Sequence, residues 1–149
     1  MRIDYIVSED GLRIDTFPKG ILDIKGTIDH FYRIKNDGGI KQGAVEIVYF
    51  KYVYNLKILH TEKHQIKKSY QDAESRKKIK ARIFVCENGI TYTIGMMLQT
   101  LHGLMHPDYN LLVVSSEDEF PDAMNHISPN NGYQRIRTLN THYWQVKHE

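Results

Sequence analysis

The chain has 149 residues, of which 41% are hydrophobic and 26% are charged, and its formal net charge is +2. These values are those of an ordinary globular protein and exclude the disordered and membrane-embedded classes. Acidic and basic residues interrupt the N-terminal residues 1–5, and no apolar run approaches the roughly 20 residues of a membrane span. We therefore expect a cytoplasmic protein that is not transmembrane. Its one cysteine, Cys86, cannot form an internal disulfide, which agrees with a reducing compartment.

Two short runs rich in β-branched residues open the chain, at residues 2–7 and 12–17. The polar residues between them end in Gly11, as tight turns favour, so the sequence predicts a β-hairpin. Residues 21–24 either prolong the second strand or lead into a helix. Apolar spacing from about residue 26 to residue 35 then predicts a short amphipathic helix.

A nearly continuous apolar run follows at residues 44–50, broken only by Glu46. Such a run is typical of a strand covered on both faces, so we expect a central strand here. Residues 52–56 stay apolar but leave the strand pattern. From residue 60 to residue 79 the chain is mostly polar, and its thin apolar stripe predicts a helix on the outside of the sheet.

A strand–helix–strand unit is the clearest pattern in the chain, and the rest is organised around it. Residues 81–85 predict a buried strand, and the 3.6-residue spacing from about residue 90 to residue 101 predicts a helix. The helix stops before Pro107, and residues 110–114 predict the second strand. A final short helix is expected over residues 116–127, where hydroxyl and acidic residues suit its N-terminal end.

These elements predict a single α/β domain with a mixed sheet of about five strands and helices mostly on one face. We place this domain at residues 1–127 and a C-terminal extension at residues 128–149. The extension alternates around Tyr143, Trp144 and Val146, which allows an added strand or an arm docked on its own domain or on another copy. A homodimer is therefore one alternative.

Short motifs in this order of elements resemble those of the STAS-like α/β family, whose best-known members are bacterial anti-sigma-factor antagonists of the SpoIIAA type. A poorly characterised branch of that family fits more closely. The matching positions are Gly11, Leu12, Gly20, residues 81–85, Tyr92, Ile94, Gly95, Met96, Met97 and residues 116–119 leading into Ala123. The resemblance covers about residues 1–127, and most of its motifs are structural.

The resemblance implies a compact regulatory module that acts by binding a protein partner or, as in related lipid carriers, an apolar ligand. Phosphorylated members carry an Asp-Ser pair followed by Gly at the helix after the central strand. Phosphorylation of a hydroxyl there adds negative charge that changes partner binding. Residues 51–64 contain neither Ser nor Gly, and Thr61 is the one hydroxyl near a helix start. The sequence therefore argues against a phosphorylation switch.

No pattern in the sequence indicates a cofactor or a metal site. Two His-x-x-x-His pairs occur, His60 with His64 and His102 with His106, but neither has the adjacent glutamate of a zinc protease. We interpret them as surface histidines. Cys86 follows a strand, and a small buried residue is favoured over a reactive thiol. No nucleophile, base and orienting group occur in a recognisable order, so the sequence favours a protein that is not an enzyme.

Basic residues gather between Lys63 and Arg82, and they form the strongest electrostatic feature of the sequence. Such a cluster can bind the backbone phosphates of a nucleic acid. Charges elsewhere nearly cancel it, and a solvated helix face is the favoured interpretation. We expect no nucleic-acid partner.

Aromatic residues cluster after the central strand, where clefts form in open α/β sheets. We predict a ligand-binding cleft lined by Tyr52, Tyr54, Tyr92 and Met96, with Phe50, Tyr52 and Tyr54 on one side of the chain. An apolar core with a polar rim is the alternative. The preferred function is a non-enzymatic module that binds a protein partner, and the second is a protein that binds a small molecule or lipid in this cleft.

Overall fold

The computed structural model describes residues 3–57, 62, 64, 65, 68, 79–105 and 110–127. The elements are β1 (Asp4–Val7), β2 (Arg13–Phe17), β3 (Lys19–Asp23), α1 (Ile24–Asn36), β4 (Ala44–Tyr49), β5 (Tyr52–Lys57), β6 (Ile79–Val85), α3 (Gly89–Met105), β7 (Asn110–Val114), the 3₁₀ helix η2 (Glu117–Glu119) and α4 (Phe120–Ile127). No helix in these ranges is long and apolar enough to span a membrane.

The main sheet has five strands in the order β1-β2-β4-β6-β7. Strands β1 and β2 are antiparallel, and every other neighbouring pair is parallel. Gly11 turns the first hairpin with a φ of +74°, a left-handed conformation that glycine adopts at no steric cost. The expected mixed α/β sheet is confirmed, with the hairpin at one edge and β4 at its centre.

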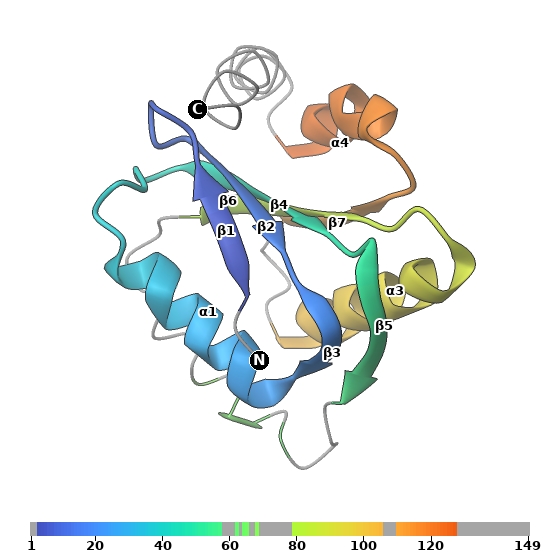
Figure 1. Ribbon diagram of the computed structural model, residues 1–149. Coiled ribbons are helices and arrows are strands. Elements are labelled where there is room, and N and C mark those ends of the chain that lie inside the picture. Colours follow the sequence, from blue (N-terminus) through green and yellow to red (C-terminus); the bar gives the residue numbers. More distant parts are fainter. Residues whose placement is uncertain are drawn as a thin grey trace.

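Helices α1 and α3 lie on one face of this sheet, and α4 lies on the other (Figure 1). Alternate residues of a strand point to opposite faces. On one face, buried residues of β4 and β6 meet α3 around Phe84 and Ile94, while Ile14 and Ile79 meet α1 around Ile34. The opposite face packs against Phe120 and Ala123 of α4. The expectation that helices lie mostly on one face is thus confirmed for α1 and α3.

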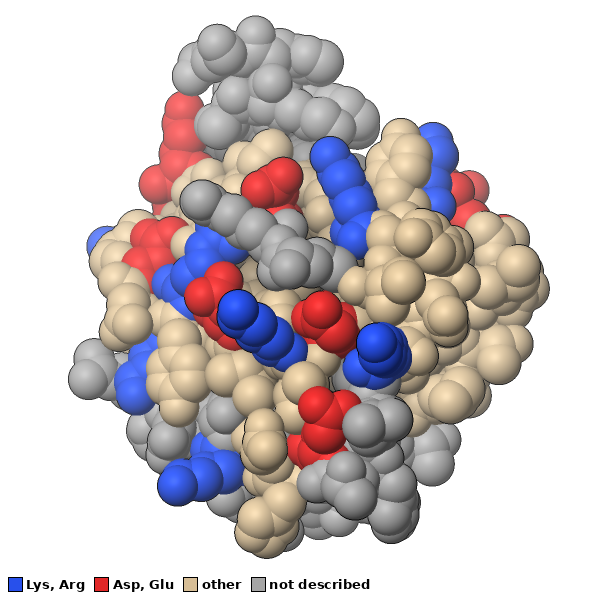
Figure 2. Space-filling model, turned by 60° about the horizontal axis from the view of Figure 1, so that its bottom comes forward, with Lys and Arg blue, Asp and Glu red and all other residues tan. Residues whose placement is uncertain are grey.

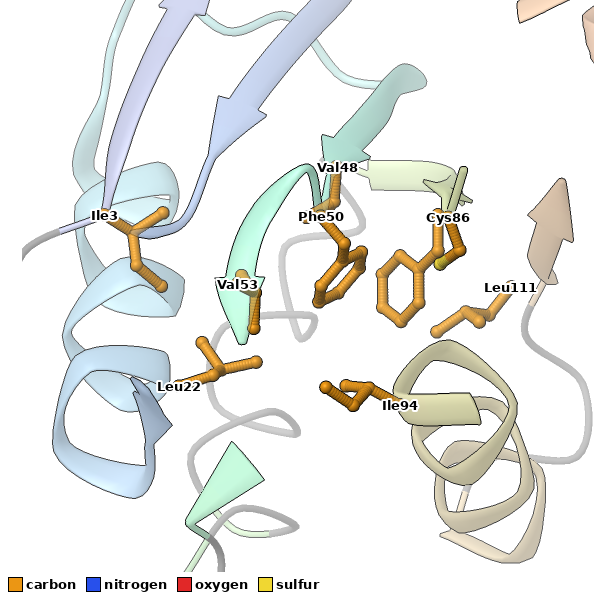
Figure 3. Close-up of a cluster of buried hydrophobic side chains, with 9 residues drawn as sticks. Ile3, Leu22, Val48, Phe50, Val53, Cys86, Ile94 and Leu111 are labelled. Carbon is orange, nitrogen blue, oxygen red and sulfur yellow. The ribbon is translucent and has the colours of Figure 1, made fainter. Parts of the chain in front are cut away.

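A second, two-stranded sheet is formed by β3 and β5, which run parallel to each other. The sequence prediction that residues 52–56 leave the strand pattern is wrong, because this segment is β5. The prediction that Phe50 shares a side with Tyr52 and Tyr54 is also wrong. Phe50 and Val53 both enter the core, since a turn at Lys51 separates β4 from β5 (Figure 3).

The final helix begins as predicted, with a 3₁₀ turn before α4. Most of the predicted helix at residues 60–79 lies outside the described residues, as does the C-terminal extension at residues 128–149. The strand–helix–strand unit is confirmed in β6, α3 and β7.

Candidate functional site

Seven large apolar side chains are exposed among the described residues. They come from β3, β5 and the first half of α3: Ile21, Tyr52, Tyr54, Ile90, Tyr92, Met96 and Met97. Single exposed apolar residues are normal on a protein surface, but a contiguous group marks a binding site. Figure 2 shows a broad area without charged side chains on the side of the molecule where α3 begins.

The outer face of the β3–β5 sheet carries two exposed tyrosines of strand β5. Tyr52 is 58% exposed and Tyr54 is 67% exposed, whereas Val53 between them is buried. A Cβ built on Gly20 would meet the Tyr54 ring at 3.8 Å, so this ring lies beside the backbone of β3. Strand alternation therefore places both rings together on the outside of the sheet.

Helix α3 divides its exposed apolar residues between two flanks. Ile94 points into the core toward Val53 (Figure 3), and Gly95 lies against Cys86, just after β6, and Val113 of β7. At 100° per residue, Ile90 and Met97 fall on the flank toward β5, and Tyr92 and Met96 fall on the far flank. Helix α3 and β5 are in contact, so the flank with Ile90 and Met97 lies on the side of the helix nearer β5.

The four residues predicted to line one cleft therefore form two pairs. Tyr52 and Tyr54 lie together on β5, and Tyr92 and Met96 lie together on α3. All four are exposed, and their role in ligand binding stays a prediction. We define the apolar surface as Ile21, Tyr52, Tyr54, Ile90 and Met97, with Tyr92 and Met96 at its margin.

A buried polar cluster lies beneath α1 and centres on Glu46 of β4. One carboxylate oxygen, Oε1, accepts a hydrogen bond from Arg82 Nε at 2.5 Å. The other oxygen, Oε2, accepts one from the Thr16 hydroxyl at 2.6 Å and lies 2.6 Å from His30 Nε2. His30 Nδ1 is buried without a hydrogen-bond partner among the described residues. In the sequence, Glu46 stands out only as an interruption of an apolar strand.

Opposite charges keep Glu46 ionised inside the protein. Burial alone would raise the pKa of this carboxyl group, but the charges of His30 and Arg82 and two hydrogen bonds outweigh burial and lower its pKa well below the ordinary 4.5. A carboxylate held ionised in this way is a poor proton donor or acceptor near neutral pH. The cluster is therefore suited to holding α1 on the sheet rather than to acid–base catalysis.

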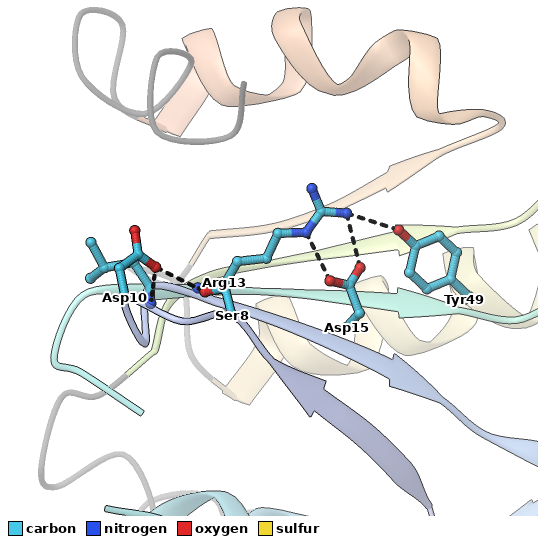
Figure 4. A network of polar contacts seen from close by, with 6 residues as sticks. Ser8, Asp10, Arg13, Asp15 and Tyr49 are labelled. Atoms are coloured by element: carbon cyan, nitrogen blue, oxygen red, sulfur yellow. Dashed lines mark hydrogen bonds and ion pairs between the residues drawn. The ribbon is translucent and has the colours of Figure 1, made fainter. Parts of the chain in front are cut away.

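A second polar network lies on the opposite face of the sheet, toward α4 (Figure 4). Arg13 forms two hydrogen bonds to the carboxylate of Asp15, at 2.8 and 2.9 Å, and a third to the Tyr49 hydroxyl at 3.1 Å. Burial opposes the charge of Arg13, but Asp15 beside it raises the pKa of the guanidinium. Burial also raises the pKa of Tyr49, so its hydroxyl stays protonated. This arrangement anchors β2 to β4.

Cys86 lies between the end of β6 and α3 and is buried. Burial raises the pKa of its thiol to about 12, despite a hydrogen bond from the backbone of Gly95. The thiolate is the reactive form of cysteine, so this environment opposes nucleophilic chemistry. The interpretation of Cys86 as a packing residue agrees with its position.

Among the described residues, no group of three or more His, Cys, Asp or Glu side chains is placed to hold a metal ion. The side chains of His60, His102 and His106 lie outside the described residues. One open hollow against α1 is lined by Tyr5, Asp29, Tyr32, Arg33, Asn36 and Asp37. Three of its polar side chains are engaged, because the Tyr5 hydroxyl donates to Asp37 at 2.8 Å and Arg33 donates to the Ile3 carbonyl at 2.6 Å.

The class that the topology defines is an α/β protein with a mixed five-stranded sheet. No family model matches the chain, and no curated protein matches it in sequence. Two solved structures are similar to it. One is an uncharacterised protein of the DUF3478 family with a SpoIIAA-like fold from Shewanella loihica PV-4, at 10% identity and a TM-score of 0.47, covering 84% of this chain and 91% of that one.

The second similar structure is the anti-sigma factor antagonist SpoIIAA in its unphosphorylated form. It is 10% identical, with a TM-score of 0.44, and the match covers 80% of this chain and 94% of that one. Both structures have the fold that the sequence resemblance names. A likeness of this degree concerns the fold alone and leaves activity, ligand and partner to the residues themselves.

Proposed function

We propose that this chain is a non-enzymatic, regulatory interaction module of the cytoplasm that binds a protein partner through the apolar surface. The observation that carries the proposal is the exposure of Tyr52 and Tyr54 on β5 and of Ile90 and Met97 on the neighbouring helix α3. Tyrosine supplies large contact area at low entropic cost and is frequent among the residues that dominate binding energy.

The chemistry of the buried groups supports a binding role. Glu46 is ionised but its charge is compensated by its partners, and the thiol of Cys86 is protonated and buried. The described residues therefore offer no activated nucleophile with a base beside it. Exposed apolar area costs free energy in water. Among the described residues, it is therefore the feature that best indicates a binding surface.

Site-specific photo-crosslinking tests the proposal. A benzoylphenylalanine placed at Tyr54 should capture a discrete protein in the cells of origin, and the same group at the exposed Gln42, in the loop before β4, should not. The double variant Ile90→Asp/Met97→Asp should weaken capture at position 54, because it buries charge in the interface. A Lys41→Asp variant, in the loop before β4, is the control. Equal capture at positions 54 and 42 would contradict the proposal.

A small molecule or lipid is the second candidate occupant, favoured by the exposure of Tyr92 and Met96 on α3. A thioether beside an aromatic ring forms an adaptable apolar contact. Native mass spectrometry of gently purified protein separates the two candidates. A bound organic mass that is lost in a Tyr92→Asp/Met96→Asp variant would favour the ligand, and a clean polypeptide mass would favour the protein partner.

A further inference from the structure

Lysines flank the tyrosines on the outer face of the β3–β5 sheet. Lys19 is the cross-strand partner of Tyr52, and the ammonium of Lys51 lies 5.6 Å from the centre of the Tyr52 ring. Lys57 ends the same strand. All three side chains are exposed, and none forms an ion pair with a residue that the structure describes.

One carboxylate offsets part of this charge. Asp23 is the cross-strand partner of Lys57, but its Oδ1 accepts the backbone N–H of Gly26 at 2.8 Å and caps α1. This carboxylate is committed to the positive end of a helix dipole. Among the described residues of β3, β5 and the turn at Lys51, the positive charges around the tyrosines therefore outnumber the negative ones.

We propose that the occupant of the apolar surface is an acidic polypeptide segment. This inference rests on the proposed function and specifies the chemistry of the partner. An apolar side chain of the segment packs on Tyr52 and Tyr54, and its carboxylates lie near Lys19, Lys51 and Lys57. An apolar centre with a charged rim is the usual anatomy of a protein interface, and rim charges select an oppositely charged partner.

Two other anionic occupants fit the same face less well. A nucleic acid gains affinity from many phosphate contacts, whereas three lysines offer few, and the aliphatic Ile21, Ile90 and Met97 would lie against its polar backbone. An anionic membrane is usually recognised by a cluster of about four to eight basic residues. A polypeptide, by contrast, can contact the aliphatic residues through its own apolar side chains and the lysines through its carboxylates.

The test measures binding of defined probes to the full chain by fluorescence anisotropy. The probes are a short labelled peptide that alternates glutamate and leucine, its lysine–leucine counterpart, a thymidine oligonucleotide, and vesicles that contain phosphatidylserine. The glutamate peptide should bind, and raising NaCl from about 50 mM to about 500 mM should weaken it, because exposed charges are screened.

Charge reversal then locates the binding face. Lys19→Glu/Lys51→Glu/Lys57→Glu should weaken binding of the glutamate peptide by at least about tenfold. Tyr52→Ala/Tyr54→Ala should weaken it at all salt concentrations. Lys41→Glu, an exposed lysine in the loop before β4, should leave affinity unchanged. Circular dichroism confirms that each variant is folded.

Each remaining outcome decides between the proposals. Equal binding of the lysine peptide, or no effect of the triple variant, would overturn the acidic partner, and so would tighter binding of the oligonucleotide or vesicles. If the glutamate peptide does not bind while crosslinking at Tyr54 still captures a protein, the acidic partner is wrong and the interaction module stands. If crosslinking fails as well, both are wrong.

Discussion

Glu46 accepts hydrogen bonds from groups on three other elements, and its removal leaves the charge of Arg82 buried without its partner. We expect Glu46→Gln to lower the free energy of unfolding by about 3 kcal/mol, because breaking one side of a buried ionic cluster strands its partners. Urea unfolding measures this. Glu87→Gln makes the same chemical change at an exposed site and should stay within about 0.5 kcal/mol of the wild type. Equal losses in the two variants would contradict the role of the cluster.

The same carboxylate makes stability depend on pH in a defined direction. Because the pKa of Glu46 is lower in the folded chain than its ordinary value of 4.5, acid protonates the unfolded chain first. Its contribution is complete above pH 4.5 and declines as pH falls below that value. The difference in unfolding free energy between the wild type and Glu46→Gln should therefore shrink from about pH 5 downward. A difference that grows in acid would show the opposite shift.

Sequence reasoning missed this cluster because its members are distant along the chain. His30 lies 16 residues from Glu46, and Arg82 lies 36 residues from it, so no local spacing joins them. The sequence showed only a charged residue inside an apolar strand. A buried position for Glu46 followed from the strand prediction, and a search for opposite charges on neighbouring predicted strands could have proposed Arg82.

At the scale of secondary-structure elements, helix α3 begins at an N-cap formed by a side chain. Asn88 Oδ1 accepts the backbone N–H of Thr91 at 2.9 Å, and the Asn88 carbonyl accepts that of Tyr92 at 2.8 Å. We expect Asn88→Ala to cost about 1 kcal/mol of stability. Asn88→Asp keeps the cap and should stay within about 0.5 kcal/mol of the wild type. Chemical denaturation distinguishes them, and equal losses would show that the cap contributes nothing.

Two glycines of α3 provide a matched test of how closely the helix packs. A Cβ at Gly95 would lie 2.6 Å from Cys86 Sγ and 3.3 Å from Val113, whereas a Cβ at Gly89 would meet nothing within 4 Å. Gly95→Ala should cost about 2 kcal/mol through overpacking, and Gly89→Ala should cost nothing. Unfolding free energies check both. A tolerated Gly95→Ala would mean that α3 shifts freely on the sheet.

The elements that the sequence predicted well are those whose periodicity is local. The spacing of Ile94 and Leu98 marks the buried side of α3 without reference to other strands. Strand β5 was missed because its partner, β3, is remote and their register shifts between Gly20 and Ile21. The structure places the four predicted cleft residues in two pairs for a related reason, since the rotation of α3 about its axis, which decides where Tyr92 and Met96 lie relative to β5, depends on tertiary contacts.

At the scale of the whole molecule, Cys86 reports on opening of the core. Its thiol has a pKa of about 12 and lies against Gly95 of α3, while its backbone N–H donates to Val114 of β7. At pH 8 nearly all of the native thiol is therefore protonated. We expect a thiol reagent to label the native chain very slowly and the urea-unfolded chain at the rate of a free cysteine, measured by mass spectrometry.

Two variants distinguish whether this thiol is exposed by opening of the whole domain or by detachment of α3 alone. Glu46→Gln loosens the cluster beneath α1, and Gly95→Ala loosens α3 directly. If the domain opens as one cooperative unit, both variants accelerate labelling, by about tenfold for each 1.4 kcal/mol of stability lost. If α3 detaches alone, Gly95→Ala accelerates labelling and Glu46→Gln does not. We expect both to accelerate it, because β4 and β6 carry core residues beneath α1 and α3 together, so that neither helix can leave without exposing their shared sheet.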